Sequence, residues 1–148
     1  MNRILDEDLQ SIIEQPVQWE KLENKSVMIT GASGMVGSYF VRTLLKLNAA
    51  RQMNIRVICV ARNVQKLGED IRENNAVEVL AHDVTKPFAY DGKIDYIIHA
   101  ASPASPLIMK DNPVETIAAN VLGTYYTLEL AREKQAEGYM FISSREIY

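Results

Sequence analysis

The stretch KSVMITGASGMVGSYF, residues 25–40, decides the fold of this chain. A short apolar segment with β-branched residues, 27–30, runs directly into glycine-rich sequence, and a helix-like pattern follows at once. The three glycines, Gly31, Gly34 and Gly37, are spaced three residues apart. A simple turn needs only one glycine. The spacing therefore indicates a strand–loop–helix unit whose backbone must come close to something else.

Length and composition indicate one globular domain with a core. The chain has 148 residues, of which 47% are hydrophobic and 24% are charged, as is usual for such a domain. A net charge of −3 and a pI near 5.4 give no reason to expect nucleic acid or an anionic membrane as a partner. No apolar run approaches the roughly 20 residues of a membrane-spanning helix, and the acidic residues 1–10 do not resemble a secretion signal. We expect a cytoplasmic protein.

The single cysteine, Cys59, cannot form an internal disulfide, and its apolar neighbours predict a small buried core residue. His99 also lies in an apolar segment, so we interpret it as a hydrogen-bonded core residue rather than a catalytic one. No His, Cys, Asp or Glu cluster has the spacing of a metal site, and no metal is expected.

The rest of the chain alternates between strand-like and helix-like segments. Strands are predicted at 26–30, 55–61, 76–84, 94–102 and 139–144, and helices at 35–47, 63–73 and 113–134. Apolar strands separated by helices indicate a parallel sheet that is covered on both faces. The handedness of such crossovers leads to an α/β fold with a doubly wound parallel sheet of the Rossmann type, with five of the usual strands present.

Residues 1–24 are set apart from the domain formed by residues 25–148. A helix is predicted at 3–15, because apolar residues fall on one face, and Pro16 ends it. This helix is expected to pack on the domain or on a second subunit. At the start of the long helix, Asn112 is expected to cap, with Pro113 in the first turn and Glu115 completing a capping box.

The three glycines suit a phosphate-binding site. The first turn of a helix has N–H groups without intrahelical partners, and the helix dipole adds partial positive charge there. We expect Gly31 to make the tight turn, Gly34 to let a pyrophosphate approach the backbone, and Gly37 to let the helix pack on the strand. The alternative is an ordinary strand-to-helix turn without a ligand.

TGASGMVG, residues 30–37, resembles the fingerprint of the short-chain dehydrogenase/reductase superfamily, particularly its extended branch that modifies nucleotide sugars. Later segments resemble motifs of that family in the same order: AHDV (81–84), IIHAASPASP (97–106), NVLGT (120–124) and FISSREIY (141–148). The ASPASP run is especially similar to UDP-glucuronate decarboxylases. The resemblance therefore extends from about residue 25 to the last residue.

The resemblance implies NAD or NADP as cofactor and a nucleotide sugar as the substrate of the full-length enzyme. The implied cofactor-binding residues are Gly31, Ser33, Gly34, Met35, Val36, Gly37, Arg62, Asp83, Val84, Ala100, Ala101, Ser102 and Asn120.

Several of these positions have simpler explanations. Asp83 is implied to contact the adenine ring, but an Asp here can equally cap the turn before 85–87. Asn120 is implied to support the active site, although it could be a surface residue. Gly123, inside the same predicted helix, would be explained by a close approach of helix to sheet, since Gly costs about 1 kcal/mol there relative to Ala.

The end of the second predicted strand bears on the choice of cofactor. NAD enzymes of this fold usually place an acid there to hold the ribose 2′-hydroxyl. This sequence has Ala61 near that position, followed by Arg62. An arginine suits a 2′-phosphate because its planar fork pairs with phosphate oxygens. We therefore hypothesise that NADP binds at least as well as NAD. The alternative is a solvated Arg62 at a strand end.

Two residues at the end of the fifth predicted strand match catalytic positions of the resembled family. Ser144 matches the residue that hydrogen-bonds the sugar hydroxyl being oxidised, and Glu146 matches a Glu that acts near the sugar ring. A serine at a strand end is also common without any such role. Arg145 departs from the family pattern, which argues against 4,6-dehydration and leaves decarboxylation open.

The Y-x-x-x-K pair of the resembled family is absent, because no tyrosine here is followed by lysine four residues later. We therefore expect the chain to be the cofactor-binding portion of a nucleotide-sugar epimerase, dehydratase or decarboxylase, inactive alone. The alternatives are a non-catalytic dinucleotide-binding module and a short-chain reductase of a non-sugar carbonyl. An unpaired edge beyond the fifth strand predicts a homo-oligomer.

Overall fold

The sheet has five parallel strands in the order β3-β2-β1-β4-β5. The structure, a computed structural model, describes residues 3–103 and 106–143, except the side chains of Pro106 and Ile108. The strands are β1 Ser26–Thr30, β2 Arg56–Ala61, β3 Val77–Ala81, β4 Tyr96–His99 and β5 Gly138–Phe141. This order confirms the predicted doubly wound fold. β1 has the predicted bounds, whereas β3, β4 and β5 end before the predicted residues 84, 102 and 144.

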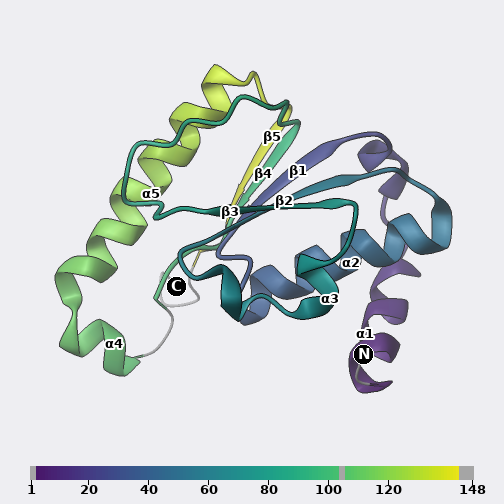
Figure 1. Cartoon of the computed structure of the whole chain (residues 1–148), viewed down its shortest axis with the longest axis horizontal. Helices are drawn as coiled ribbons and strands as arrows, with labels where there is room; N and C mark the ends of the chain where they lie inside the picture. Colours follow the sequence, from purple (N-terminus) through teal and green to yellow (C-terminus); the bar gives the residue numbers. More distant parts are fainter. Residues whose placement is uncertain (1–2, 104–105, 144–148) are drawn as a thin grey trace.

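Helices lie on both sides of this sheet (Figure 1). The α-helices are α1 Arg3–Ile13, α2 Met35–Arg51, α3 Glu69–Arg72, α4 Pro106–Asp111 and α5 Pro113–Glu133, and the 3-10 turns are η1 Trp19–Leu22 and η2 Val64–Lys66. The connection from β3 to β4, residues 82–95, crosses the sheet without a helix.

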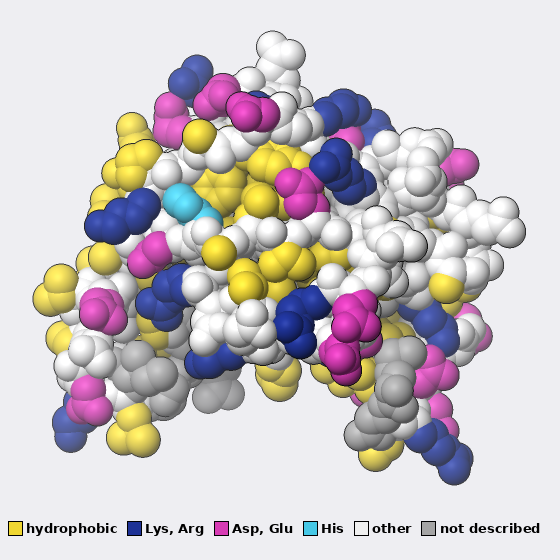
Figure 2. Space-filling view, viewed as in Figure 1, with side chains coloured by type: hydrophobic (Ala, Val, Ile, Leu, Met, Phe, Trp, Pro, Cys, Tyr) yellow, Lys and Arg dark blue, Asp and Glu magenta, His cyan; other side chains and the backbone are white. Residues whose placement is uncertain are grey.

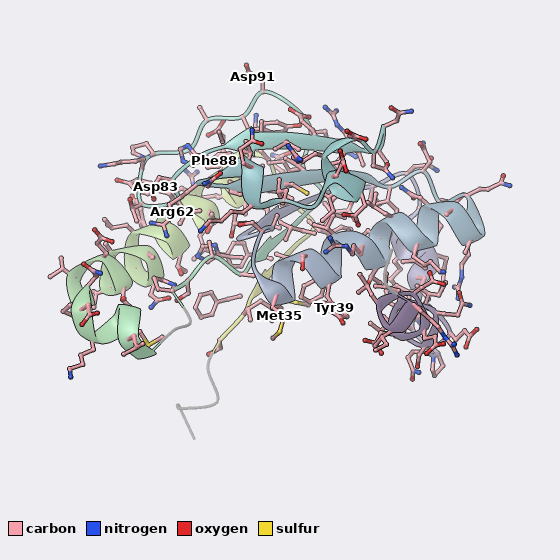
Figure 3. All side chains as sticks on the ribbon, turned by 60° about the horizontal axis from the view of Figure 1, so that its bottom comes forward. Met35, Tyr39, Arg62, Asp83, Phe88 and Asp91 are labelled. Carbon is pink, nitrogen blue, oxygen red and sulfur yellow. The ribbon has the colours of Figure 1, made fainter. Side chains whose placement is uncertain are left out.

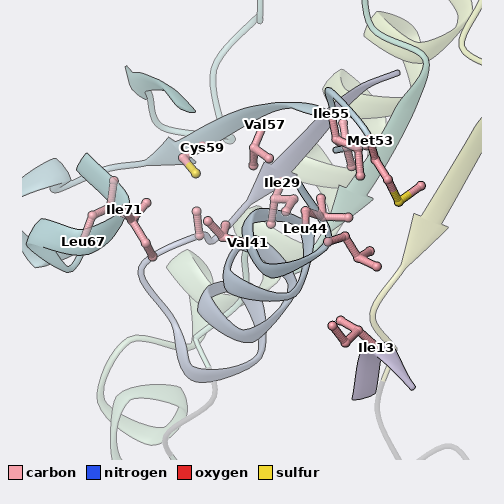
Figure 4. Close-up of a cluster of buried hydrophobic side chains, with 13 residues drawn as sticks. Ile13, Ile29, Val41, Leu44, Met53, Ile55, Val57, Cys59, Leu67 and Ile71 are labelled. Atoms are coloured by element: carbon pink, nitrogen blue, oxygen red, sulfur yellow. The ribbon is translucent and has the colours of Figure 1, made fainter. Parts of the chain in front are cut away.

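Alternation along the strands divides the core into two layers. In β1, Ile29 faces the cluster that contains Val41 and Leu44 of α2 (Figure 4). Met28, one residue earlier, faces the opposite layer with Leu130 of α5. Because both faces of the inner strands are covered, these strands are apolar at nearly every position.

Cys59 is fully buried in the layer next to α2, as predicted. Burial raises the pKa of its thiol to about 12.

The predicted helix at 63–73 is wrong. The chain forms two short turns, η2 and α3, separated at Gly68. The Asn63 side chain accepts a hydrogen bond from the N–H of Gln65 at 3.0 Å, which starts η2 separately. Leu67 and Ile71 are both buried, so each turn is anchored in the core on its own.

Asn112 is the N-cap residue of α5 and Pro113 stands in its first turn, both as predicted, but the Asn112 side chain makes no capping hydrogen bond. Instead, the Asn112 carbonyl accepts hydrogen bonds from the N–H and the hydroxyl of Thr116. Helix α4, which the sequence did not predict, ends at Asp111, so Asn112 is a one-residue joint between two helices.

Helix α1 packs on α2 of the same chain. Leu9 and Ile13 are buried, and Asp6 forms an ion pair with Lys46 at 2.7 Å. The Tyr39 hydroxyl donates to Asp8 at 3.0 Å. Of the two partners considered for this helix, the structure shows the domain itself.

Two leucines of α5 test the assignment of the layers. Leu130 is 1% exposed and Leu128 is 45% exposed. Leu130→Ala is expected to lower the free energy of unfolding by about 2–5 kcal/mol, because it leaves a cavity in the core. Leu128→Ala, the matched control, should change it by about 0.5 kcal/mol or less. Urea denaturation measures both, and equal effects would contradict the described packing.

Candidate functional site

The candidate site lies where the carboxyl ends of β1 and β4 separate. The chain leaves β1 toward α2 on one face of the sheet and leaves β4 toward α5 on the other (Figure 1). Such a switch point is where open α/β sheets bind ligands. A cleft of about 710 Å³ is present here, lined by Gly31, Ser33, Gly34, Val60, Ala61, Arg62, Asn63, Lys66, His82, Asp83, Val84, Thr85, Lys86, Ala100, Ala101, Ser102, Pro103, Glu115, Ala118 and Ala119.

Backbone contacts shape one wall of this cleft. Gly31 has a φ of +68°, and a Cβ there would lie 2.6 Å from the carbonyl oxygen of Ala100. Gly37 is buried under the same turn, and its Cβ would lie 2.3 Å from the oxygen of Gly31. Only glycine fits these two positions, because any side chain would displace the backbone that it meets.

The start of α2 is open toward the cleft. Gly34 is the N-cap residue of α2, is exposed, and provides no side chain to cap the first turn. The first N–H groups of a helix have no intrahelical acceptors. An anion in the cleft can therefore use these N–H groups together with the positive end of the helix dipole.

A buried hydrogen bond joins the two strands that flank the switch point. Thr30, the last residue of β1, bonds through its hydroxyl to Nδ1 of His99, the last residue of β4, at 2.7 Å. His99 is 1% exposed, and burial lowers its pKa to about 4, so the ring is neutral at physiological pH. Among the described residues its Nε2 has no hydrogen-bond partner. The prediction of a core histidine is confirmed, but only one ring nitrogen is bonded.

Helix α5 comes very close to this histidine. A Cβ on Gly123 would lie 3.0 Å from the side chain of Val84 and 3.3 Å from Nε2 of His99. The predicted close approach of helix and sheet is therefore present at Gly123.

Asp83 makes the turn that the sequence allowed and also lines the cleft. Its Oδ1 accepts hydrogen bonds from the Thr85 N–H at 3.0 Å and the Thr85 hydroxyl at 2.9 Å. These bonds, the N–H bond first, together with the nearby charge of Arg62, hold the pKa of Asp83 below its usual value. Figure 3 shows Arg62 and Asp83 close together, away from Met35 and Tyr39 on α2.

Most of the predicted cofactor-binding residues meet in this cleft. They are Gly31, Ser33, Gly34, Arg62, Asp83, Val84, Ala100, Ala101 and Ser102.

Four predicted cofactor residues are not in the lining. Met35 and Val36 are exposed and line a different groove, so only their backbone N–H groups are available to the cleft. Gly37 is buried under the Gly31 turn. Asn120 is half-buried in α5, and its carbonyl accepts a hydrogen bond from Thr124. The predicted catalytic residues Ser144 and Glu146 lie outside the described residues.

Sequence reasoning missed several lining residues. Asn63 and Lys66 follow β2 closely, as Arg62 does, so their position after a strand end could have indicated them. Lys86 follows β3 in the same way. Glu115 and Ala118 reach the cleft only because α5 packs beside β4, and the sequence carries no local signal for that.

A second groove, of about 770 Å³, lies on the α2 side of β4 and β5. Its lining is almost entirely apolar and includes Tyr39, Phe40, Tyr96, Ile98 and Met140. It therefore differs in character from the cleft, where charged and polar side chains gather.

The strand order and the cleft at the switch point define a Rossmann-type α/β domain. The model of the NAD dependent epimerase/dehydratase family matches residues 27–148. The chain belongs to this family, which confirms the resemblance drawn from its motifs.

Relatives and solved structures agree with this assignment. The chain is 34% identical over 129 residues to UDP-glucuronic acid decarboxylase 6 of Arabidopsis thaliana, covering 84% of this chain and 35% of that protein. It is 31% identical over 130 residues to UDP-glucuronic acid decarboxylase 1 of Danio rerio, covering 85% and 29%. The chain thus spans about a third of the length of these relatives.

The fold is shared with a UDP-galactose 4-epimerase at a TM-score of 0.68 and 23% identity, covering 83% of this chain and 39% of that one. The Bordetella bronchiseptica enzyme WbmF in complex with NAD+ gives a TM-score of 0.66 at 20% identity, covering 86% of this chain and 41% of that one.

Among the described residues, no helix is both long and apolar enough to cross a membrane.

The depressed pKa of His99 predicts a dependence of stability on pH. Between pH 6.5 and about 4 the unfolded chain binds a proton on His99 that the folded chain does not. The free energy of unfolding should therefore fall as the pH falls through this window, by about 3 kcal/mol from this residue. In His99→Gln, which keeps a partner for Thr30, this part of the dependence should vanish. Urea titrations at pH 7, 6, 5 and 4.5 measure the difference, and parallel curves for the two proteins would contradict the prediction.

Proposed function

We propose that this chain is the dinucleotide-binding portion of an NAD(P)-dependent enzyme that modifies nucleotide sugars, in the manner of the UDP-glucuronate decarboxylases. One observation carries the proposal: the cleft at the β1–β4 switch point is walled by bare backbone at the start of α2. Membership of the NAD dependent epimerase/dehydratase family and relatives named UDP-glucuronic acid decarboxylase support it. The kind of sugar and the net reaction of the whole enzyme are also proposed rather than shown, because the chain spans only about a third of the length of those relatives.

The residues present fit such a cofactor. The glycine turn and the uncapped start of α2 leave room for a ligand beside the backbone. A Cβ on Gly34 would crowd this turn, because it would lie 3.2 Å from the carbonyl oxygen of Gly31. We assign the pyrophosphate to this wall, because a helix start stabilises anions. We assign contact with the adenine ring to Asp83, which lines the cleft together with residues 100–102.

A bound nicotinamide would supply the acceptor for a hydride from the sugar carbon that carries a hydroxyl, the hydroxyl proton passing to a base, which permits the later steps of such reactions. The residues that line the cleft would hold and orient the cofactor. Thr30 and His99 keep the ends of β1 and β4 at a fixed separation through their buried hydrogen bond. We assign contact with the sugar to Ser144 and Glu146.

Gly34→Ala tests the assignment of the pyrophosphate. The added methyl group is expected to raise the Kd for NAD+ or NADH about tenfold, equivalent to the loss of one charge-assisted hydrogen bond of about 1.5 kcal/mol. Titration calorimetry measures the Kd. The test uses binding rather than turnover, because no tyrosine in the chain is followed by lysine four residues later and no activity is expected from it alone.

Lys21→Gln is the control, since it removes an exposed charge outside the cleft. Thermal unfolding establishes that both variants are folded. Absence of binding by the unaltered chain, or equal affinity for Gly34→Ala, would refute the proposal.

We further propose that the protein is cytoplasmic and homo-oligomeric. One buried cysteine suits a reducing compartment. In the described chain β5 pairs only with β4, while Met140 and Phe141 are 49% and 45% exposed. Figure 2 also shows hydrophobic side chains along the edge formed by α5, where Val114, Ile117 and Val121 are exposed. Unpaired apolar edges favour association.

Light scattering during gel filtration, over a range of concentrations, tests the association. The unaltered chain is expected to form a dimer or larger species, and Met140→Lys is expected to shift it toward monomer, because a charge on β5 opposes pairing. Val17→Lys, at an exposed apolar position before β1, should leave the distribution unchanged. A monomer at all concentrations would rule the proposal out.

A further inference from the structure

Three positive side chains of the cleft form no ion pair with a described residue, although Arg62 and Lys86 lie near enough to Asp83 to lower its pKa. Arg62, Lys66 and Lys86 line the cleft and are exposed, and within the described ranges none of them has a carboxylate oxygen within 4 Å. Elsewhere basic side chains are paired, for example Arg42 with Asp70 at 2.7 Å and Lys46 with Asp6 at 2.7 Å. The cations of the cleft are thus available to an anionic ligand.

The end of β2 also lacks the acid that would hold a ribose 2′-hydroxyl. The strand ends at Ala61, which is 4% exposed and pairs in register with Ala81 of β3. Neither of these two residues carries a carboxylate that would repel a phosphate. The acid that follows β3 by two residues, Asp83, lines the same cleft near Arg62.

The backbone after β2 is held in place rather than loose. Asn63 accepts a hydrogen bond from the Gln65 N–H through its side chain and from the Lys66 N–H, at 3.2 Å, through its carbonyl. Leu67, at 2% exposed, anchors the end of this turn in the core. Arg62 and Lys66 are consequently presented on the cleft side of one preorganised turn, which lowers the entropic cost of binding.

Two acids also line the cleft, Asp83 and Glu115. Asp83, which follows β3, accepts hydrogen bonds from the N–H and the hydroxyl of Thr85. Glu115 lies in the first turn of α5, across the cleft from β2. Three cations against two acids leave the lining positive, in a chain whose net charge is −3.

We infer that the turn after β2 is a subsite for a ribose 2′-phosphate, bound by Arg62 and Lys66, and that this chain prefers NADP(H) to NAD(H). The inference rests on the proposed dinucleotide site and deepens it. The guanidinium of Arg62 can pair with two phosphate oxygens at once, and Lys66 adds a second charge from the same turn.

Calorimetric titration of the full chain with NADPH and with NADH tests this. NADPH is expected to bind at least about tenfold more tightly, since charge-assisted hydrogen bonds to the phosphate are made only by NADPH. Arg62→Gln and Lys66→Gln should each raise the Kd for NADPH about tenfold or more and change the Kd for NADH less than about twofold. Lys21→Gln, the matched control, should change neither, and added salt should weaken NADPH more than NADH.

The possible results separate the two proposals. Binding of NADH as tight as or tighter than NADPH overturns the 2′-phosphate subsite and leaves the dinucleotide site intact. A preference for NADPH that survives both substitutions also overturns it, because the phosphate would then be held elsewhere. Binding of neither cofactor refutes the proposed function itself, and this inference falls with it.

Discussion

The close approach of two backbone segments at the switch point controls the rest of the site. The turn at Gly31 lies against the carbonyl of Ala100, and the first turn of α2 lies against Gly31 through Gly37. These contacts are possible only because neither glycine has a Cβ. The hydrogen bond between Thr30 and His99 holds the two strand ends together just behind this point. A cleft with walls of bare backbone is the direct consequence.

The two hollows of the molecule show how one sheet separates two kinds of surface. The cleft at the carboxyl ends gathers Arg62, Asp83 and Glu115, because loops after parallel strands converge there. The groove beside α2 is formed by side chains from the middle of β4 and β5, which are apolar because they belong to the interior face of a sheet. Their similar volumes do not imply similar ligands. The chemistry of the lining distinguishes them.

The chain combines the pattern of its family with departures of its own. The glycine spacing and the segment after β4 follow the family pattern. They line the part of the cleft that we assign to the portion of the dinucleotide that NAD and NADP have in common. The end of β2 departs from it, with Ala61 and Arg62 where an acid is usual for NAD. Arg62 is exposed and lines the cleft, so its charge bears on the ligand rather than on the core.

The amino-acid sequence by itself determined the strands, the crossovers and the glycine turn, because apolar periodicity and glycine spacing are local signals. It also indicated Arg62 through its place after a strand, and Asp83 and Ala100 through the resemblance of their segments to the family. Tertiary structure decided that residues 63–73 form two short turns, because Leu67 and Ile71 are buried separately in the core. It also decided the joint at Asn112, because a further helix, α4, precedes α5. Only packing brought Glu115 and Ala118 to the cleft, because they reach it through the position of α5 beside β4 and no local pattern marks that position.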